Sequence, residues 1–301
     1  MNEELLAGGN THGAVVRVDE TVRRPTGRWT PGVHALLRHL EAKSFDGSPR
    51  VLGIDSENRE ILTFVPGDVV YPDHLELMMT DEGLGAVATL VRNLHDAVSD
   101  FASPVAYTWS DRASDTHLVG ELVCHNDLAP WNLVHTPDDR FVFIDWDLAA
   151  PGPRSWDLAW ALLTFIPLMP GDETDHSTIT HRLTLFRDAY GAAQMTSDVI
   201  DVAVSRCQRE ANLIATLGRK REPPYDRLLA EGHFEIWSRA AEHVATYADR
   251  WKNVLSNCRD LRPTDLDFSA GADAPTGDAA ECSQGRSRSG FQHPCTRRTH
   301  G

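Results

Sequence analysis

The stretch "CHNDLAPWN" at residues 124–132, followed by "FVFID" at residues 141–145, decides the fold of this chain. Both stretches place polar residues next to apolar runs of the kind that form β-strands. Asp127 and Asn132 lie five residues apart between two such runs. We therefore expect both on one loop at strand ends. The turn sequence "PDDR" between the last two runs predicts a hairpin that returns Asp145 beside Asn132.

These residue types at this spacing suit the handling of phosphate. The carboxamide of Asn132 and the carboxylate of Asp145 offer hard oxygen ligands for Mg²⁺, which also binds phosphates. Asp127, which is not needed as a ligand, could accept a proton from a hydroxyl group or align it. Taken singly, the residues have structural explanations, since Asp147 and Asp157 could cap helices. The joint pattern H-x-D-x4-N, strand, turn, strand, I-D is far more restrictive and favours a phosphate site.

Composition and charge restrict the class of protein. The chain has 301 residues, 41% of them hydrophobic and 24% charged, as in ordinary globular proteins with one large or two smaller cores. The net charge of −15 disfavours binding to nucleic acid. Such a charge could attract a cationic partner, or it could serve solubility alone. The sequence leaves both explanations open.

No segment of the sequence predicts export or membrane insertion. The first ten residues are acidic and show no basic start followed by an apolar run, so no secretory signal is expected, and the longest apolar run, residues 158–170, is too short to cross a bilayer. The five cysteines are irregularly spaced and form no CxxC pair, which argues against a zinc ribbon and a disulfide framework. We expect a cytoplasmic protein that binds neither nucleic acid nor membrane. The sequence does not predict its oligomeric state.

Hydrophobic periodicity divides the chain into three parts. Residues 1–67 read as a β-rich unit, and turn residues in "VPGD" mark its end. Residues 68–257 are mostly helical, whereas residues 258–301 lack apolar periodicity and are expected to be a disordered tail or, alternatively, a partner-binding segment. The strands are expected at 14–18, 21–24, 50–54, 60–64, 121–124, 132–135 and 140–144, and the helices at 30–43, 81–101 and through most of 156–255.

At these motifs the sequence resembles the aminoglycoside phosphotransferase and choline kinase-like group, which has the protein-kinase fold. "HNDLAPWN" and "IDWD" are similar to the kinase catalytic loop and D-F-G segment in relaxed form. The resemblance implies a bilobal α+β fold with a small β-rich lobe and a larger helical lobe. It implies that Asp127 is the catalytic base or orients the acceptor hydroxyl, and that Asn132 and Asp145 bind Mg²⁺. His125 would brace the loop, and Asp157 in "WDLAW" would help to hold it.

The resemblance also assigns the small unit to nucleotide binding. The loop "GGNTHGAVV" (8–16) would fold over the phosphates, and the strand "TVRRP" would supply a cation in place of the usual Lys. Arg23 is favoured for this cation over Arg24. The ATP-binding residues implied are Gly9, Gly13 and Arg23, together with Phe64 and Val65 of the lobe connector.

Two departures from protein kinases are visible. The helix that should supply a Glu to the strand cation has Val33 and His34 there, so the usual ion pair should be absent or replaced. Only eleven residues separate Asp145 from Asp157, too few for an activation loop or a peptide-docking platform. Protein kinase activity is therefore disfavoured. A small hydroxylated acceptor is favoured instead.

The sequence thus predicts an ATP- and Mg²⁺-dependent enzyme that phosphorylates a hydroxyl of a small molecule. A cationic acceptor such as an aminoglycoside suits the acidic chain, although the sequence does not identify it. One alternative is a catalytically weak kinase-like binding or immunity protein. Another is a metal-dependent phosphoesterase with His125, Asp127, Asp145 and Asp147 as ligands.

Overall fold

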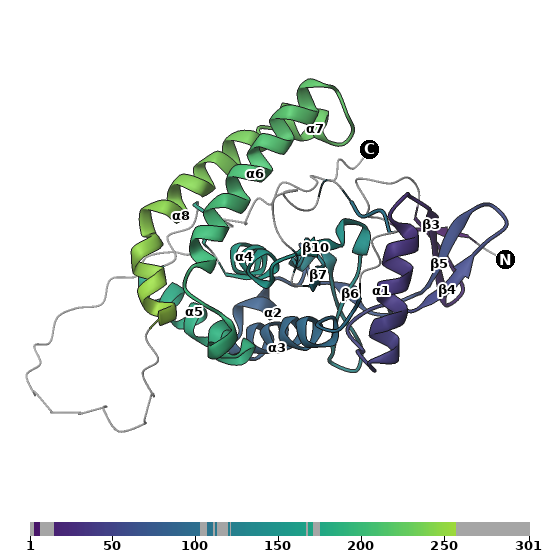
Figure 1. Ribbon diagram of the computed structural model, residues 1–301, viewed down its shortest axis with the longest axis horizontal. Coiled ribbons are helices and arrows are strands. Elements are labelled where there is room, and N and C mark those ends of the chain that lie inside the picture. Colours follow the sequence, from purple (N-terminus) through teal and green to yellow (C-terminus); the bar gives the residue numbers. More distant parts are fainter. Residues whose placement is uncertain are drawn as a thin grey trace, which may run out of the picture.

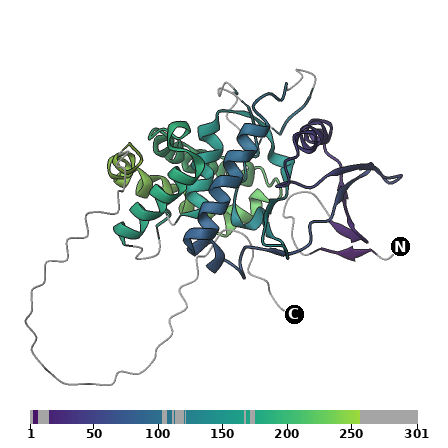
Figure 2. The ribbon, with the colours of Figure 1, turned by 90° about the horizontal axis from the view of Figure 1, so that it is seen from below.

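The chain forms two lobes, one built on a sheet and the other mostly helical, which both views show side by side (Figures 1 and 2). The structure is a computed structural model. It describes residues 3–6, 15–102, 107–110, 112, 120, 122–166, 168–170 and 175–256. The α+β, two-lobed arrangement is the one predicted. The expected tail at 258–301 lies outside the described residues.

The sheet of the small lobe is antiparallel, with strand order β1-β2-β3-β5-β4. Successive side chains of a strand point to opposite faces of a sheet. The neighbours Arg23 and Arg24 on β3 must therefore point to different faces. The strands are β1 (Glu4–Leu5), β2 (Val16–Val18), β3 (Thr21–Pro25), β4 (Val51–Ile54) and β5 (Arg59–Thr63).

Helix α1 (Thr30–Ala42) begins with a proline in its first turn and lies beside the sheet (Figure 1). Its apolar stripe is buried, as the helical spacing predicts. The polar residue His34 is buried with this stripe and reaches Glu60 on β5. The helix is thereby joined to the same face of the sheet as Glu60. Buried members of the stripe are Val33, Leu36, Leu37 and Leu40.

The connector between the lobes leads into a two-residue strand, β6 (Asp68–Val69), which pairs with β8 (Leu133–His135). Gly67 has φ +129°, and a Cβ atom there would lie 2.1 Å from the carbonyl oxygen of His135. Only glycine therefore permits this close approach. The connector is tied directly to the segment that follows the predicted catalytic loop.

The predicted hairpin is present. Strand β8 pairs with β9 (Phe141–Phe143), and the N–H of Ile144 donates to the carbonyl oxygen of Asn132 at 2.8 Å. This pairing brings Asp145 next to Asn132, as the turn sequence predicts. Strand β7 (Leu122–Cys124) pairs instead with β10 (Ala150–Gly152), a short strand that the periodicity does not reveal.

Helices build the larger lobe around one continuous core that includes Trp146 and Trp251. The long helices α6 and α8 pack along each other, and α3 packs against α5 (Figure 1). No helix in the described part of the chain is long and apolar enough to cross a membrane. The helices are α2 (Glu76–Met79), α3 (Asp81–Ala97), α4 (Arg154–Phe165), α5 (His176–Tyr190), α6 (Val199–Arg219), α7 (Tyr225–Ala230) and α8 (His233–Ser256), with short 3₁₀ turns at Pro130–Asn132, Trp146–Leu148 and Ala192–Gln194.

Candidate active site

His125 braces the loop between β7 and β8. Its ring is fully buried, Nδ1 accepts the backbone N–H of Asp127 at 3.2 Å, and Nε2 donates to the carbonyl oxygen of Ile144 at 3.2 Å. Burial lowers the pKa of His125, which favours the neutral imidazole that this bonding requires. The ring thus links the residue that precedes Asp145 to the backbone of Asp127.

Asp157 of α4 holds the same loop from the interior. Its carboxylate accepts the backbone N–H groups of His125 at 2.8 Å and Asn126 at 2.7 Å. Burial opposes the ionised form, but the hydrogen bond and charge of His95 outweigh it and lower the pKa of Asp157. Arg206 of α6 donates to the carbonyl oxygen of Asn126 at 2.8 Å. This support allows Asn126 to keep a left-handed backbone with φ 69°.

The carboxylate of Asp127 is held by three side-chain N–H groups. Oδ2 accepts from Asn132 at 2.7 Å and from Trp131 at 3.2 Å, and Oδ1 accepts from Trp160 at 2.9 Å. Since a carboxylate offers about four acceptor positions, Oδ1 can still accept one more hydrogen bond. Desolvation raises the pKa of Asp127, with His125 and the indole N–H groups opposing the shift. The group is therefore oriented and a better proton acceptor than a free aspartate.

Asn132 and Asp145 lie on neighbouring loops joined by the hairpin. The amide nitrogen of Asn132 donates its hydrogen bonds to Asp127. The amide oxygen Oδ1 of Asn132 accepts no hydrogen bond from the described residues. Asp145 follows β9 with a left-handed backbone, φ 60°, and its side chain is 36% exposed. The amide oxygen of Asn132 and the carboxylate of Asp145 are thus available as oxygen ligands.

The donor set fits Mg²⁺ that arrives with a nucleotide. No group of three or more His, Cys, Asp or Glu side chains suited to hold a metal occurs among the described residues. Magnesium at phosphate sites commonly uses one or two protein ligands and takes the rest from phosphates and water. Burial raises the pKa of Asp147 to about 7, with Arg24 opposing and Asp145 and Glu60 adding to the shift. Three carboxylates, those of Asp145, Asp147 and Glu60, thus surround the guanidinium of Arg24, and this excess of negative charge favours binding of a divalent cation.

The phosphoesterase alternative requires His125 and Asp147 as metal ligands. Both ring nitrogens of His125 already make hydrogen bonds, and Oδ1 of Asp147 accepts from Arg24 at 2.7 Å. A metal could bind His125 only after one of its two hydrogen bonds was broken, and it would compete with Arg24 for Asp147. The bonding of the described residues therefore does not support that alternative.

Arg24, rather than Arg23, reaches the site. Arg24 is 8% exposed and donates from Nε to Glu60 at 2.6 Å and from Nη1 to Asp145 at 3.0 Å. Arg23 points to the other face of the sheet and contacts Asp55 at 3.4 Å. The structure does not bring Arg23 to Asp145, because alternation along β3 allows only one of the two neighbours to face it.

The Glu missing from the helix is replaced by Glu60 of strand β5. Glu60 lies opposite Arg24 in the β3–β5 register and is 1% exposed. It accepts from Arg24 and also from Nε2 of His34 on α1 at 2.8 Å. The strand cation and the helix are thus joined through a strand carboxylate. The only feature of the sequence that indicates this replacement is the Glu at the start of the apolar run "EILTF".

The connector residues are only partly free to bind adenine. The N–H of Phe64 donates to the carbonyl oxygen of Glu20 at 2.9 Å, and the guanidinium of Arg17 lies 3.8 Å from the centre of the Phe64 ring. No hydrogen bond of the Val65 N–H occurs within the described segments. Gly9 and Gly13 lie outside the described residues.

An aromatic wall that the sequence motifs do not predict adjoins Asp127. The ring of Trp160 stacks on Trp237 of α8 with centroids 5.0 Å apart, and the guanidinium of Arg206 lies 4.5 Å from the centre of the Trp160 ring. On the same helix as Arg206, desolvation raises the pKa of Glu210, and the charge of Asp127 adds to the shift. Helices α4, α6 and α8 therefore surround the carboxylate that would face an acceptor.

Comparisons with known proteins identify the family of the chain. A family model described as the phosphotransferase enzyme family matches residues 106–194. The trifolitoxin immunity protein of Rhizobium leguminosarum bv. trifolii is 31% identical over 207 residues, which cover 64% of this chain and 76% of that protein.

Solved kinases share the fold at low identity. Ethanolamine kinase of Plasmodium vivax is 12% identical with a TM-score of 0.57, over 84% of each chain. Spectinomycin phosphotransferase in complex with ADP and spectinomycin is 11% identical with a TM-score of 0.56, over 82% of this chain and 93% of that one. A choline/ethanolamine kinase family protein of Mesorhizobium loti is 15% identical with a TM-score of 0.52, over 85% and 92%. The chain therefore belongs to the phosphotransferase enzyme family and has its bilobal, protein-kinase-like fold.

Proposed function

We propose that the protein is an ATP- and Mg²⁺-dependent phosphotransferase that phosphorylates a hydroxyl group of a small molecule. The observation that carries this proposal is the Asp127 carboxylate, which three N–H donors fix beside Asn132 while Oδ1 keeps an acceptor position. Asp145 lies on the adjoining loop, which a backbone hydrogen bond from Ile144 ties to Asn132. This combination is what transfer of a phosphoryl group to a positioned hydroxyl requires.

In the proposed reaction the acceptor hydroxyl donates a hydrogen bond to Oδ1 of Asp127. The hydroxyl oxygen forms a bond to the γ-phosphorus, the bond from that phosphorus to the ADP oxygen breaks, and the hydroxyl proton passes to Asp127. The raised pKa of Asp127 assists this proton transfer. Asn132 and Asp145 would hold Mg²⁺, which when bound neutralises charge on the phosphates.

The nucleotide would be held by the small lobe and the connector. We assign the phosphate-binding cation to Arg24, since Glu60 fixes its Nε while Nη1 faces Asp145. Because the N–H of Phe64 is already bonded, its carbonyl oxygen and the N–H of Val65 are the groups left for the adenine edge. Gly9 and Gly13 remain our proposal for the loop over the phosphates.

A cationic acceptor, such as an aminoglycoside or another amine, is the substrate class that we propose. The chain carries a net charge of −15, and a second carboxylate, Glu210, lies near enough to Asp127 for their charges to interact.

Turnover of ATP against a panel of aminoglycosides, amines and sugars tests the function, with product mass measured in the same samples. Asp127→Asn should lower turnover of the accepted substrate by roughly 10²- to 10⁴-fold, the usual contribution of a positioned base. Asp139→Asn is the matched control, because Asp139 has a side chain that is 94% exposed on the β8–β9 hairpin. Undiminished turnover in Asp127→Asn would contradict the role of Asp127.

A second candidate is an immunity protein that binds a toxic compound without phosphorylating it. The similarity to a trifolitoxin immunity protein favours it. Expression in a trifolitoxin-sensitive strain separates the candidates if wild type protects the cells. Protection that Asp127→Asn retains would indicate binding alone, and protection that this variant loses would indicate phosphoryl transfer.

A further inference from the structure

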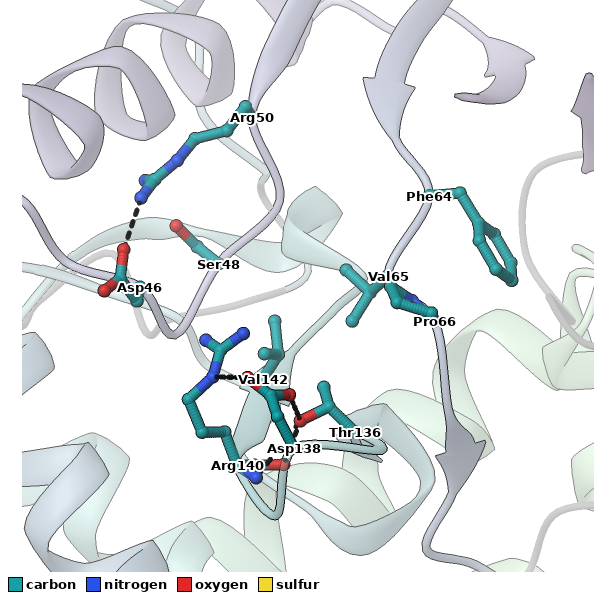
Figure 3. A pocket seen from close by; sticks show the side chains of 10 residues that line it. All are labelled: Asp46, Ser48, Arg50, Phe64, Val65, Pro66, Thr136, Asp138, Arg140 and Val142. Atoms are coloured by element: carbon teal, nitrogen blue, oxygen red, sulfur yellow. Dashed lines mark hydrogen bonds and ion pairs between the residues drawn. The ribbon is translucent and has the colours of Figure 1, made fainter. Parts of the chain in front are cut away.

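A hollow of about 400 Å³ lies at the lobe connector. Its walls come from residues 46–50 of the small lobe, the connector at 64–66, and the β8–β9 hairpin at 136–142 (Figure 3). Asp127, Asn132 and Asp145 do not line it. Figure 3 shows the Phe64 ring turned away from the other lining side chains, and this ring packs against Arg17 of β2 instead.

Two buried polar atoms in the walls of this hollow have no hydrogen-bond partner among the described residues. Ser48 is 6% exposed, and its Oγ makes no hydrogen bond. Nη1 of Arg50 is also buried and unpaired, although Nη2 of the same guanidinium donates to Asp46 at 3.0 Å. Buried polar groups in folded proteins nearly always have partners, so two orphans in one wall point to a ligand that supplies acceptors.

The opposite lobe contributes a second guanidinium. Nε of Arg140 donates to Asp138 at 2.6 Å, and its two terminal nitrogens make no hydrogen bond within the described part of the chain. Figure 3 shows Arg140 reaching into the hollow from the hairpin below, across from Arg50 and Ser48. Asp46 orients Arg50 and Asp138 orients Arg140, and each guanidinium has further N–H groups that donate to no described residue. A guanidinium held in this way is well suited to bind phosphate oxygens.

We propose that this hollow is a second ligand site that takes a phosphate group, as inorganic phosphate or a phosphate monoester. Arg50 and Ser48 lie in one wall and Arg140 lies in the opposite one, and a tetrahedral group, whose oxygens point in more directions than those of a planar carboxylate, suits donors on two opposed walls. The charges of Arg50 and Arg140 are balanced by Asp46 and Asp138, so binding rests on charge-assisted hydrogen bonds rather than on net charge. We therefore expect an affinity on the order of millimolar.

A phosphate group in the hollow would join the two lobes. Residues 46–50 precede β4 of the small lobe, and residues 136–142 belong to the hairpin whose strands lead from Asn132 and toward Asp145. A ligand bonded to both segments would restrict movement at the connector between them. The hollow shares Phe64 and Val65 with the connector to which we assign the adenine, but its phosphate donors, Arg50, Arg140 and Ser48, have no part in the proposed function, so the inference does not depend on it.

Inorganic phosphate at constant ionic strength is the probe for the full chain. The melting temperature of wild type should rise with phosphate, and amide hydrogen exchange should slow in 46–50 and 136–142. Ser48→Ala and Arg140→Ala should each weaken phosphate binding at least about tenfold, the loss expected for a hydrogen bond to a charged group. Arg38→Ala, which removes an exposed arginine of α1 that has no ion-pair partner in the described part of the chain, is the charge-matched control and should bind as wild type does.

Folding and binding can be told apart in these variants. Ser48→Ala removes a buried hydroxyl that makes no hydrogen bond to any described residue, so without phosphate it should melt no lower than wild type. The proposal is overturned if phosphate leaves wild type unchanged, if the two variants bind as tightly as wild type, or if protection appears only in residues 122–132. Equal stabilisation by acetate would also overturn it, because a planar carboxylate would then be the ligand.

Discussion

Nη1 of Arg24 donates to Oδ1 of Asp145 at 3.0 Å, although the two residues lie 121 positions apart in the chain. The bond joins the central strand of the small lobe to the loop after the hairpin of the larger lobe. Glu60 holds the same guanidinium through Nε, and His34 holds Glu60 from helix α1. A strand, a helix and the candidate metal-binding loop are therefore coupled through one buried cation.

Replacing Arg24 with Met should destabilise the fold more than the same change at Arg23. Arg24→Met leaves three carboxylates near one another without their shared cation, and breaking a buried ion pair typically costs about 3–5 kcal/mol. Arg23 makes one longer contact, with Asp55, so Arg23→Met should cost about 1 kcal/mol or less. Urea unfolding followed by circular dichroism measures both free energies. Equal losses would show that Arg24 has no special structural role.

Asp157→Asn should lower the free energy of unfolding at pH 7 by about 2–4 kcal/mol. Asparagine cannot accept both backbone N–H groups that the Asp157 carboxylate accepts, and hydrogen bonds to charged groups contribute about 1.5–3 kcal/mol each. The folded pKa of Asp157 lies below its ordinary value of 3.8, so its ionised form stabilises the fold above that pH. This contribution is lost as the pH falls through the folded pKa.

The difference in the free energy of unfolding between wild type and Asp157→Asn should therefore become smaller below about pH 4. Urea unfolding of both proteins at pH 7 and at successively lower pH values measures it. A gap that stays constant down to the acid unfolding of wild type would contradict the assignment of the charged carboxylate.

Trp160→Phe should impair catalysis without weakening nucleotide binding, if the proposed function is correct. The change removes the N–H that Asp127 accepts at 2.9 Å but keeps an aromatic ring in the stack. A less well oriented Asp127 should lower kcat by about tenfold while KM for ATP stays unchanged. Trp160 is thus a positioning residue, and steady-state kinetics separates the two parameters.

Trp237→Phe is the matched control for this variant. Trp237 stacks on Trp160, yet its indole N–H makes no hydrogen bond to Asp127 or to another described residue. It should keep kcat within about twofold of wild type, the scale of a small packing change. Equal losses in both variants would show that aromatic packing, rather than the hydrogen bond, orients Asp127.

The sequence predicts the parts of this site that local chain geometry determines. Asp127, Asn132 and Asp145 are brought together by one loop and one hairpin, whose apolar strands and turn residues lie within 22 consecutive positions, 124–145. The pairing of Arg24 with Glu60 depends on the register of two strands separated by a helix. Because no local pattern fixes that register, the prediction from the sequence favoured Arg23, whereas the structure brings Arg24 to Asp145.

Contacts between helices that are distant in the chain could not be predicted from the sequence either. The bond from Trp160 to Asp127 and the bond from Arg206 to Asn126 depend on how α4 and α6 pack around the loop. An apolar stripe predicts that such helices are buried, but not which polar side chain meets which loop atom. Strand β6 has only two residues and shows no periodicity, so its pairing with β8 also appears only in the structure.

Gly67→Ala should lower the free energy of unfolding by about 2 kcal/mol or more, because φ +129° is strained for any residue with a Cβ. The added Cβ would lie 2.1 Å from the carbonyl oxygen of His135, so β6 would have to move away from β8. Gly85→Ala in α3 is the control. Nothing lies within 4 Å of a Cβ there, and alanine should stabilise the helix by about 0.5–1 kcal/mol. Urea unfolding should therefore shift the two variants in opposite directions, and a parallel shift would show that the connector does not need glycine.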